Sequence, residues 1–115
     1  SPPTLSSAAS DVYKRQAMAS WAKSLSNERP ACITINNVLP GFTDTERLGN
    51  LSASIQDRTG KSAADVRNDW LNQVPIGRLI DPIETASAIT FLCLPISGGI
   101  RGISLAVDGG RLRSI

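Results

Sequence analysis

The segment from Ile33 to Thr45 constrains the fold of this chain more than any other part of its sequence. Residues 33–36 alternate β-branched and polar side chains, which is typical of a strand with one face packed in a sheet. Pro40 and Gly41 then end the strand, since proline has no N–H to donate and glycine permits close backbone approach. In open α/β sheets, ligands bind at the carboxyl ends of strands. The loop that follows is therefore a candidate binding site, and an ordinary turn is the alternative.

Composition limits the classes of protein to which the chain can belong. The 115 residues are 41% hydrophobic and 19% charged, which fits one folded domain or a part of one. The net charge of +2 is dispersed, so we expect neither nucleic acid nor membrane as a partner. With no His, and with Cys32 and Cys93 far apart, we expect free thiols and no metal site. No apolar run is long enough to span a membrane and no signal peptide is evident, so we expect a cytoplasmic protein.

Periodicity predicts three helices and a second strand. We expect helices over residues 17–29, 62–74 and 81–94, and a strand over residues 102–107. The third helix has the clearest start, since Asp81 can cap it, Pro82 suits its first position and Glu84 can complete a capping box. It is apolar on most of its surface, so we expect it to be buried. The polar stretch 46–61 is expected to be a mobile segment over the end of the strand.

The first sixteen residues have a different character. Residues 1–10 lack periodicity, and residues 11–16 resemble a translated adaptor sequence. We therefore expect 1–16 to be a disordered tail or a sequence artefact, and 17–115 to be the folded part. Within that part, the order helix, strand, two helices, strand predicts an α/β fold with a right-handed crossover between parallel strands.

Four segments together resemble the carboxyl-terminal half of short-chain dehydrogenases/reductases, the single-domain Rossmann oxidoreductases. The segments are residues 23–28, residues 33–45 with the Pro-Gly pair and a Thr four residues after the Gly, residues 75–84, and residues 102–110. The resemblance covers Ala17 to Ile115. It implies the carboxyl-terminal portion of a Rossmann-like doubly wound parallel sheet.

The resemblance also implies a function for the loop. In the family, this loop holds the nicotinamide of NAD or NADP, so the cofactor-binding residues here would be Pro40, Gly41, Phe42, Thr43 and Thr45. Hydride transfer needs the ring held in near-attack geometry against a small alcohol or ketone. Residues 46–61 would form the loop that closes over the substrate. The helices at 17–29 and 62–74 would join subunits in a homodimer or homotetramer.

The chain departs from the family at the catalytic pair, a Tyr with a Lys four residues later. Counting back from the matched end of the helix places Asp11 at the Tyr position and Arg15 at the Lys position. Arg15 is the candidate catalytic residue, through a cationic contact to ribose, whereas Asp11 cannot replace a phenol. Two explanations stay open: an artefact has replaced the true residues, or the parent is a divergent member of the family.

Two functions follow as hypotheses. The first is a fragment, inactive by itself, of an NAD(P)-dependent oxidoreductase that resembles 3-oxoacyl reductases and interconverts an alcohol and a carbonyl. The second is a non-catalytic oligomerisation or interaction module derived from the same family. The intact loop at Pro40–Thr45 favours the first, and the missing Tyr/Lys pair favours the second.

Overall fold

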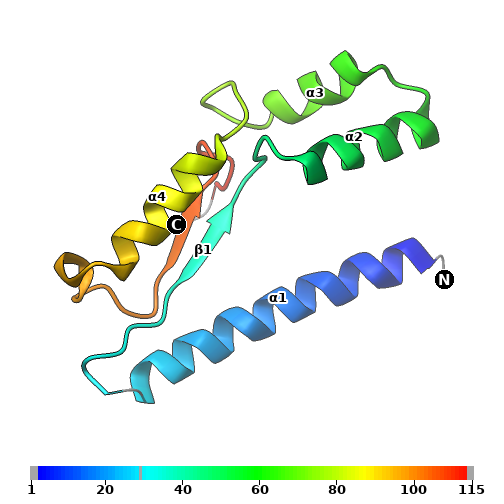
Figure 1. Ribbon diagram of the computed structural model, residues 1–115. Helices are drawn as coiled ribbons and strands as arrows, with labels where there is room; N and C mark the ends of the chain where they lie inside the picture. The colour runs from blue at the N-terminus through cyan, green and yellow to red at the C-terminus, as the bar shows by residue number, and fades with distance from the viewer. Residues whose placement is uncertain (1–2, 29, 114–115) are drawn as a thin grey trace. The chain divides into compact units, whose positions relative to one another are not determined.

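The computed structural model describes residues 3–28 and 30–113 of the chain. Its elements in order are α1 (Pro3–Glu28), β1 (Asn37–Pro40), α2 (Glu46–Thr59), α3 (Ala63–Leu71), α4 (Pro82–Cys93), the 3₁₀ helix η1 (Pro95–Ser97) and β2 (Ser104–Val107). Figure 1 shows this order from blue to red.

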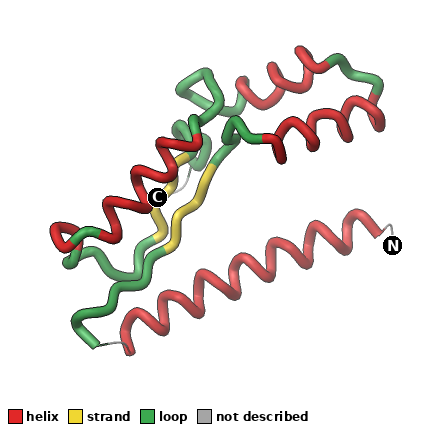
Figure 2. Tube along the Cα trace, in the orientation of Figure 1, coloured by secondary structure: helices red, strands yellow, loops and turns green. Residues whose placement is uncertain are grey.

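The two strands pair side by side in one sheet (Figure 2). Asn37 N–H donates to Ile103 O at 2.8 Å, and Gly41 N–H donates to Val107 O at 3.0 Å. Because both partners advance in the same direction, the strands are parallel. The α/β class and the parallel pairing are thus confirmed, although three α-helices and the 3₁₀ helix η1, rather than two helices, lie between the strands.

The contacts divide the chain into two compact units. The first unit comprises the chain up to Asn37 together with Leu92–Leu105, and the second comprises Val38–Phe91 together with the chain from Ala106 onward.

In the first unit, α1 is longer than the predicted helix of residues 17–29. It begins at Pro3, so residues 3–16 are helical. That residues 1–16 are a tail or a sequence artefact stays a prediction. Ser1, where the predicted tail begins, and Arg29, where the predicted helix ends, lie outside the described residues. Arg101 lies at the carboxyl-terminal end of α1. Its guanidinium donates to Ser26 O in the last turn at 3.1 Å and to Ala31 O, just beyond the helix, at 3.2 Å. Such carbonyls at a helix end have no partner within the helix, and a cation suits them.

The first strand begins later than predicted, at Asn37 rather than near Ile33. The reason is the side chain of Asn36, which binds backbone groups of the segment before β2 that regular strand pairing would bind to backbone groups. Its Oδ1 accepts from Ile103 N–H at 3.1 Å and its Nδ2 donates to Ile100 O at 3.1 Å. An Asn side chain competes with regular backbone pairing in this way.

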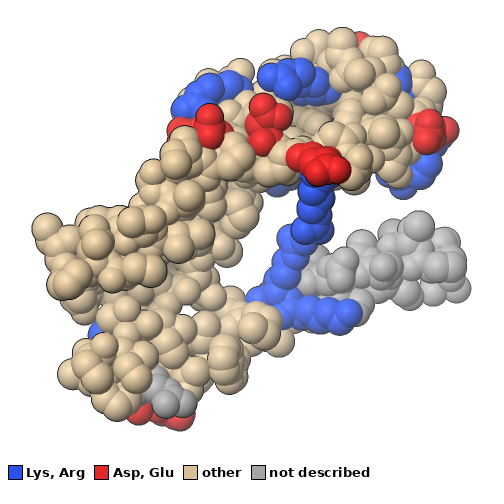
Figure 3. All heavy atoms as spheres, viewed as in Figure 1, with Lys and Arg blue, Asp and Glu red and all other residues tan. Residues whose placement is uncertain are grey.

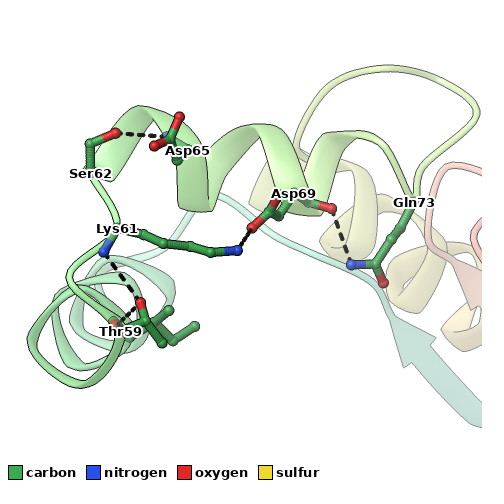
Figure 4. A network of polar contacts seen from close by, with 7 residues as sticks. Thr59, Lys61, Ser62, Asp65, Asp69 and Gln73 are labelled. Atoms are coloured by element: carbon green, nitrogen blue, oxygen red, sulfur yellow. Dashed lines mark hydrogen bonds and ion pairs between the residues drawn. The ribbon is translucent and has the colours of Figure 1, made fainter.

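In the second unit, α2 occupies most of the polar stretch 46–61, for which no helix is predicted from the sequence. The hydroxyl of Thr45 accepts from Leu48 N–H and caps the start of α2, and Gly60 ends it with a φ of 71°. Helices commonly end at a residue with left-handed backbone angles, which glycine adopts without strain. Lys61 then bonds Asp69 of α3 at 2.7 Å, in the polar network drawn in Figure 4.

The starts of α3 and α4 are confirmed. Ser62 accepts from Asp65 N–H at 3.1 Å, as predicted for a cap. At α4, Asp81 Oδ1 accepts from Ile83 N–H at 2.9 Å, and Asp81 N–H donates to Glu84 at 2.8 Å. Two reciprocal bonds of this kind form a capping box.

The predicted burial of α4 is wrong. None of its residues is buried, and Ile83 is 64% exposed. On the face drawn in Figure 3, most of the surface over α4 is uncharged. The buried apolar side chains of the second unit lie elsewhere, at Val66, Val74, Leu79 and Ile80. The described part of the chain therefore leaves an apolar helix without a cover.

Both thiols are free, as predicted. Cys32 and Cys93 are exposed and form no disulfide.

Candidate functional site

The predicted loop lies directly after β1 and is fixed by backbone hydrogen bonds within the second unit. Gly41 N–H donates to Val107 O at 3.0 Å, Ile80 N–H donates to Phe42 O at 2.9 Å, and Asp44 N–H donates to Ile80 O at 2.9 Å. The loop is therefore held on both sides, by the end of β2 and by the segment that precedes α4. Thr43 and Ile80 form an isolated parallel bridge at this point.

Gly41 is required by the packing of the protein itself. A Cβ at this position would lie 2.6 Å from the Cα of Asp108 and 2.8 Å from its Cβ. Asp108 cannot move away easily, because its buried carboxylate accepts from Gly110 N–H at 3.0 Å and from Leu112 N–H at 2.8 Å. The close approach predicted for a glycine is thus confirmed, and the neighbour is the turn after β2.

The two threonine hydroxyls of the loop have different surroundings. Thr43 is half-buried and its Oγ1 donates to Gly41 O at 3.1 Å. Thr45 is exposed and its Oγ1 caps α2 by accepting from Leu48 N–H at 3.3 Å. Within the described chain, no hydrogen bond uses the backbone N–H of Phe42 or of Thr43. The loop therefore offers free donors beside the two hydroxyls.

Phe42 lies between an aromatic ring and a cation. Its ring stacks on Trp70 of α3, with centroids 5.4 Å apart and planes 23° apart. The guanidinium carbon of Arg111 lies 4.2 Å from the centroid of the Phe42 ring. These contacts tie the loop to α3 and to the segment after β2. Sequence reasoning missed Trp70 and Arg111 as neighbours of the loop, because nothing local to either residue indicates the pairing.

A cavity of about 570 Å³ lies beside the loop, wholly within the second unit. Its lining comes from the end of β1, the turn after α3 and the segment after β2: Leu39, Pro40, Gly41, Asn72, Gln73, Asp108, Arg111, Leu112 and Arg113. The size is within the range of small-molecule sites. Pro40 and Gly41 are thus brought to one cavity with residues that the sequence did not single out.

Arg15 lies on α1 in the first unit. It is exposed, and it forms no hydrogen bond or ion pair with any other residue that the structure describes. Asp11 lies one helical turn earlier on the same helix. The spacing of four residues places both positions on one side of α1.

Elsewhere in the second unit, Arg78 and Glu84 form the strongest charge pair near the site. The Arg78 guanidinium donates two bonds of 2.8 Å to the Glu84 carboxylate. This pair, helped by Asp81 N–H, lowers the pKa of Glu84 to about 2. The same contact raises the pKa of Arg78. The pair holds the turn before α4, on which Ile80 supports the loop.

Two further features of the described residues concern metal binding and membrane crossing. No group of three or more His, Cys, Asp or Glu side chains among them is arranged to hold a metal ion. Among residues 3–28 and 30–113, no helix has both the length and the apolar character that crossing a membrane requires.

Parallel strands with helices between them, and a loop at the carboxyl end of a strand, define an α/β protein. Comparison with known proteins specifies the family. A family model described as enoyl-(acyl carrier protein) reductase matches residues 7–111. The chain belongs to the short-chain dehydrogenase/reductase family.

Individual relatives agree with this assignment. The 3-oxoacyl-(acyl-carrier-protein) reductase FabG of Vibrio harveyi is 40% identical over 78 residues, which are 68% of this chain and 28% of the relative. A short chain dehydrogenase family protein from Francisella tularensis subsp. tularensis has a TM-score of 0.78 and 29% identity, covering 84% of this chain and 40% of that chain. A variant of actinorhodin polyketide ketoreductase, solved with NADPH, has a TM-score of 0.77 and 27% identity, covering 86% of this chain and 38% of that chain.

The chain thus spans less than a third of the length of the curated relative and about two fifths of each solved structure. The family match begins at residue 7 and includes both Asp11 and Arg15.

Proposed function

We propose that this chain is the carboxyl-terminal part of an NAD(P)-dependent oxidoreductase that interconverts an alcohol and a carbonyl, with 3-oxoacyl thioesters as the substrate class. The single observation that carries the proposal is the loop Pro40–Thr45, which is anchored on both sides and has free N–H donors at Phe42 and Thr43. The relatives support it, since one is named a 3-oxoacyl reductase and another was solved with NADPH.

The loop fits a nicotinamide. A carboxamide needs both donors and acceptors, and the loop presents the backbone N–H groups of Phe42 and Thr43 together with the hydroxyls of Thr43 and Thr45. When bound, the cofactor supplies the hydride. The task of the loop is to hold the ring in one orientation, and its anchoring to Val107 and Ile80 means that little has to be ordered on binding.

Arg15 contributes as a cation rather than as an acid. The guanidinium of Arg15 offers N–H donors that can hold a ribose hydroxyl, and it is not the phenol that acts as the acid in the family. Asp11 cannot replace that phenol either. The proton that the reduction of a ketone requires must therefore come from another residue or from water.

The second candidate is a non-catalytic module that assembles through family surfaces. Asp11 and Arg15 at the positions of the Tyr/Lys pair favour it. Trp21 is 57% exposed on α1, which suits a helix that meets a second subunit. Trp70 is less available for such a contact, because its ring is stacked on Phe42. We retain the helices at 17–29 and 62–74 as the proposed contact surfaces of a homodimer or homotetramer.

The test is turnover by the full-length protein of the parent gene. We expect it to oxidise NADPH or NADH in the presence of a 3-oxoacyl thioester. Thr43→Val should raise KM for the cofactor about tenfold, as the loss of one or two hydrogen bonds implies. The matched control is Thr59→Val, whose hydroxyl bonds Ile55 O inside α2, and it should change KM less than about twofold.

Turnover, measured together with the oligomeric mass of the same preparation, separates the two candidates. An oligomer that turns over no alcohol or ketone with either cofactor would contradict the oxidoreductase proposal and favour the non-catalytic module. Equal effects of Thr43→Val and Thr59→Val on KM for the cofactor would show that the loop does not bind the cofactor.

A further inference from the structure

We propose that the cavity beside Pro40 and Gly41 binds the oxyanion group, a carboxylate or a phosphate, of a small organic ligand through Arg111 and Arg113. Both arginines line the cavity, and Asp108 is the one acidic residue in its lining. Neither guanidinium forms an ion pair with a residue that the structure describes. The charge balance of the lining is therefore positive.

Asp108 does not neutralise the arginines by direct contact. Its two carboxylate oxygens accept from Gly110 N–H at 3.0 Å and from Leu112 N–H at 2.8 Å, and the residue is buried. The carboxylate thus serves the turn after β2. The guanidinium groups remain the strongest hydrogen-bond donors available to a ligand in the cavity.

Arg111 is held in place before any ligand binds. Its guanidinium lies over the ring of Phe42, and its Nη2 donates to Gln73 Oε1 at 3.2 Å. The stacking uses the face of the group and leaves edge N–H bonds free, which is the geometry that grips a carboxylate or a phosphate. Arg113 forms no hydrogen bond with the described residues, so its side chain can close on the same anion.

The remaining residues of the cavity lining determine what kind of molecule can carry the oxyanion group. Leu39, Pro40 and Leu112 provide an apolar wall, and the amides of Asn72 and Gln73 provide polar edges. A volume of about 570 Å³ suits a small molecule rather than a bare ion. The fitting class is a small organic acid or phosphate ester with an apolar body.

This site also bears on the proposed reaction. Because Pro40 and Gly41 belong to both the cavity and the nicotinamide loop, an anion bound in the cavity would lie beside the proposed cofactor. That step rests on the proposed function, whereas anion binding does not.

The experiment is calorimetric titration of the full-length protein, without cofactor, with sodium benzoate, with benzamide and with inorganic phosphate. Benzoate and benzamide have the same ring and differ mainly in charge. We expect benzoate to bind at least about tenfold more tightly than benzamide, as charge-assisted hydrogen bonds imply. Phosphate binding in place of benzoate would assign the site to phosphate esters.

Substitutions locate the site. Arg113→Gln should weaken binding of the preferred anion about fivefold, and Arg111→Gln about tenfold. Arg67→Gln, at an exposed arginine of α3 outside the cavity, should change it less than about twofold. Arg113→Gln keeps the test valid if loss of the contact with Phe42 disturbs folding of the Arg111 variant.

The inference is overturned if neither benzoate nor phosphate binds, if benzoate binds and benzamide binds equally well, or if Arg67→Gln has the same effect as Arg113→Gln. None of these outcomes bears on cofactor turnover, so the oxidoreductase proposal is tested separately.

Discussion

Glu84 illustrates how one side chain can fix the start of a helix and support a distant loop. Its carboxylate accepts two bonds from Arg78 and one from Asp81 N–H, all at 2.8 Å. These bonds favour the charged form, which is why the pKa of Glu84 falls from 4.5 to about 2. The turn that they hold carries Ile80, whose backbone pairs with Phe42 and Asp44.

The lowered pKa predicts how Glu84→Gln will respond to pH. A carboxyl whose folded pKa is depressed contributes stability above its unfolded value of about 4.5, and the contribution is lost as pH falls toward 2. We therefore expect Glu84→Gln to be less stable than the wild type at pH 7, with a gap that narrows at pH 3. Urea unfolding of the full-length protein at both pH values measures the gap. A gap of equal size at both would show that the ion pair does not hold this turn.

At the scale of the element, α2 depends on its cap. Thr45 supplies the only side-chain acceptor for the first turn of α2 among the described residues. We expect Thr45→Ala to lower the free energy of unfolding by about 1 kcal/mol, and Thr45→Ser to retain most of it, because serine caps as well. The measurement is urea unfolding of the full-length protein. Equal stability of the Ala and Ser variants would mean that the cap contributes nothing.

Helix starts and the loop were predictable where the signal is local. Asp81, Pro82 and Glu84 lie within four residues of one another, so the capping box at α4 could be read directly from the sequence. The Pro-Gly loop was predictable for the same reason. The missed helix α2 had its signals too, in the apolar spacing of Leu48 and Ile55, but Gly49 and several serines lower helix propensity.

The rest of the candidate site depends on contacts between distant segments. Gly41 must be glycine because Asp108 lies against it, and no pattern near either residue indicates this approach. Phe42, Trp70 and Arg111 likewise meet only after α3 and β2 are in place. The prediction that α4 is buried is wrong because an apolar helix indicates only that some surface covers it. Composition does not say whether that surface belongs to the same chain.

For the whole chain, the apolar surface left exposed predicts poor folding in isolation. Trp21, Ile83 and Ile96 are 57%, 64% and 81% exposed, and no residue of α4 is buried. The described residues form a sheet of two strands, which is too small to shield the helices that a sheet of this family carries. Surfaces of this kind are normally covered by more protein.

We therefore expect the 115-residue chain alone to be inactive as a dehydrogenase and to aggregate or unfold without a cooperative transition. Thermal unfolding followed by circular dichroism, together with the hydrodynamic mass, measures this. The full-length protein is the matched control, since it contains the same residues, and it should unfold cooperatively. A monodisperse 115-residue monomer with a sharp transition would mean that two strands and their helices bury enough apolar surface to fold alone. The proposal that more of the fold is needed would then fail, whatever the activity of the longer protein.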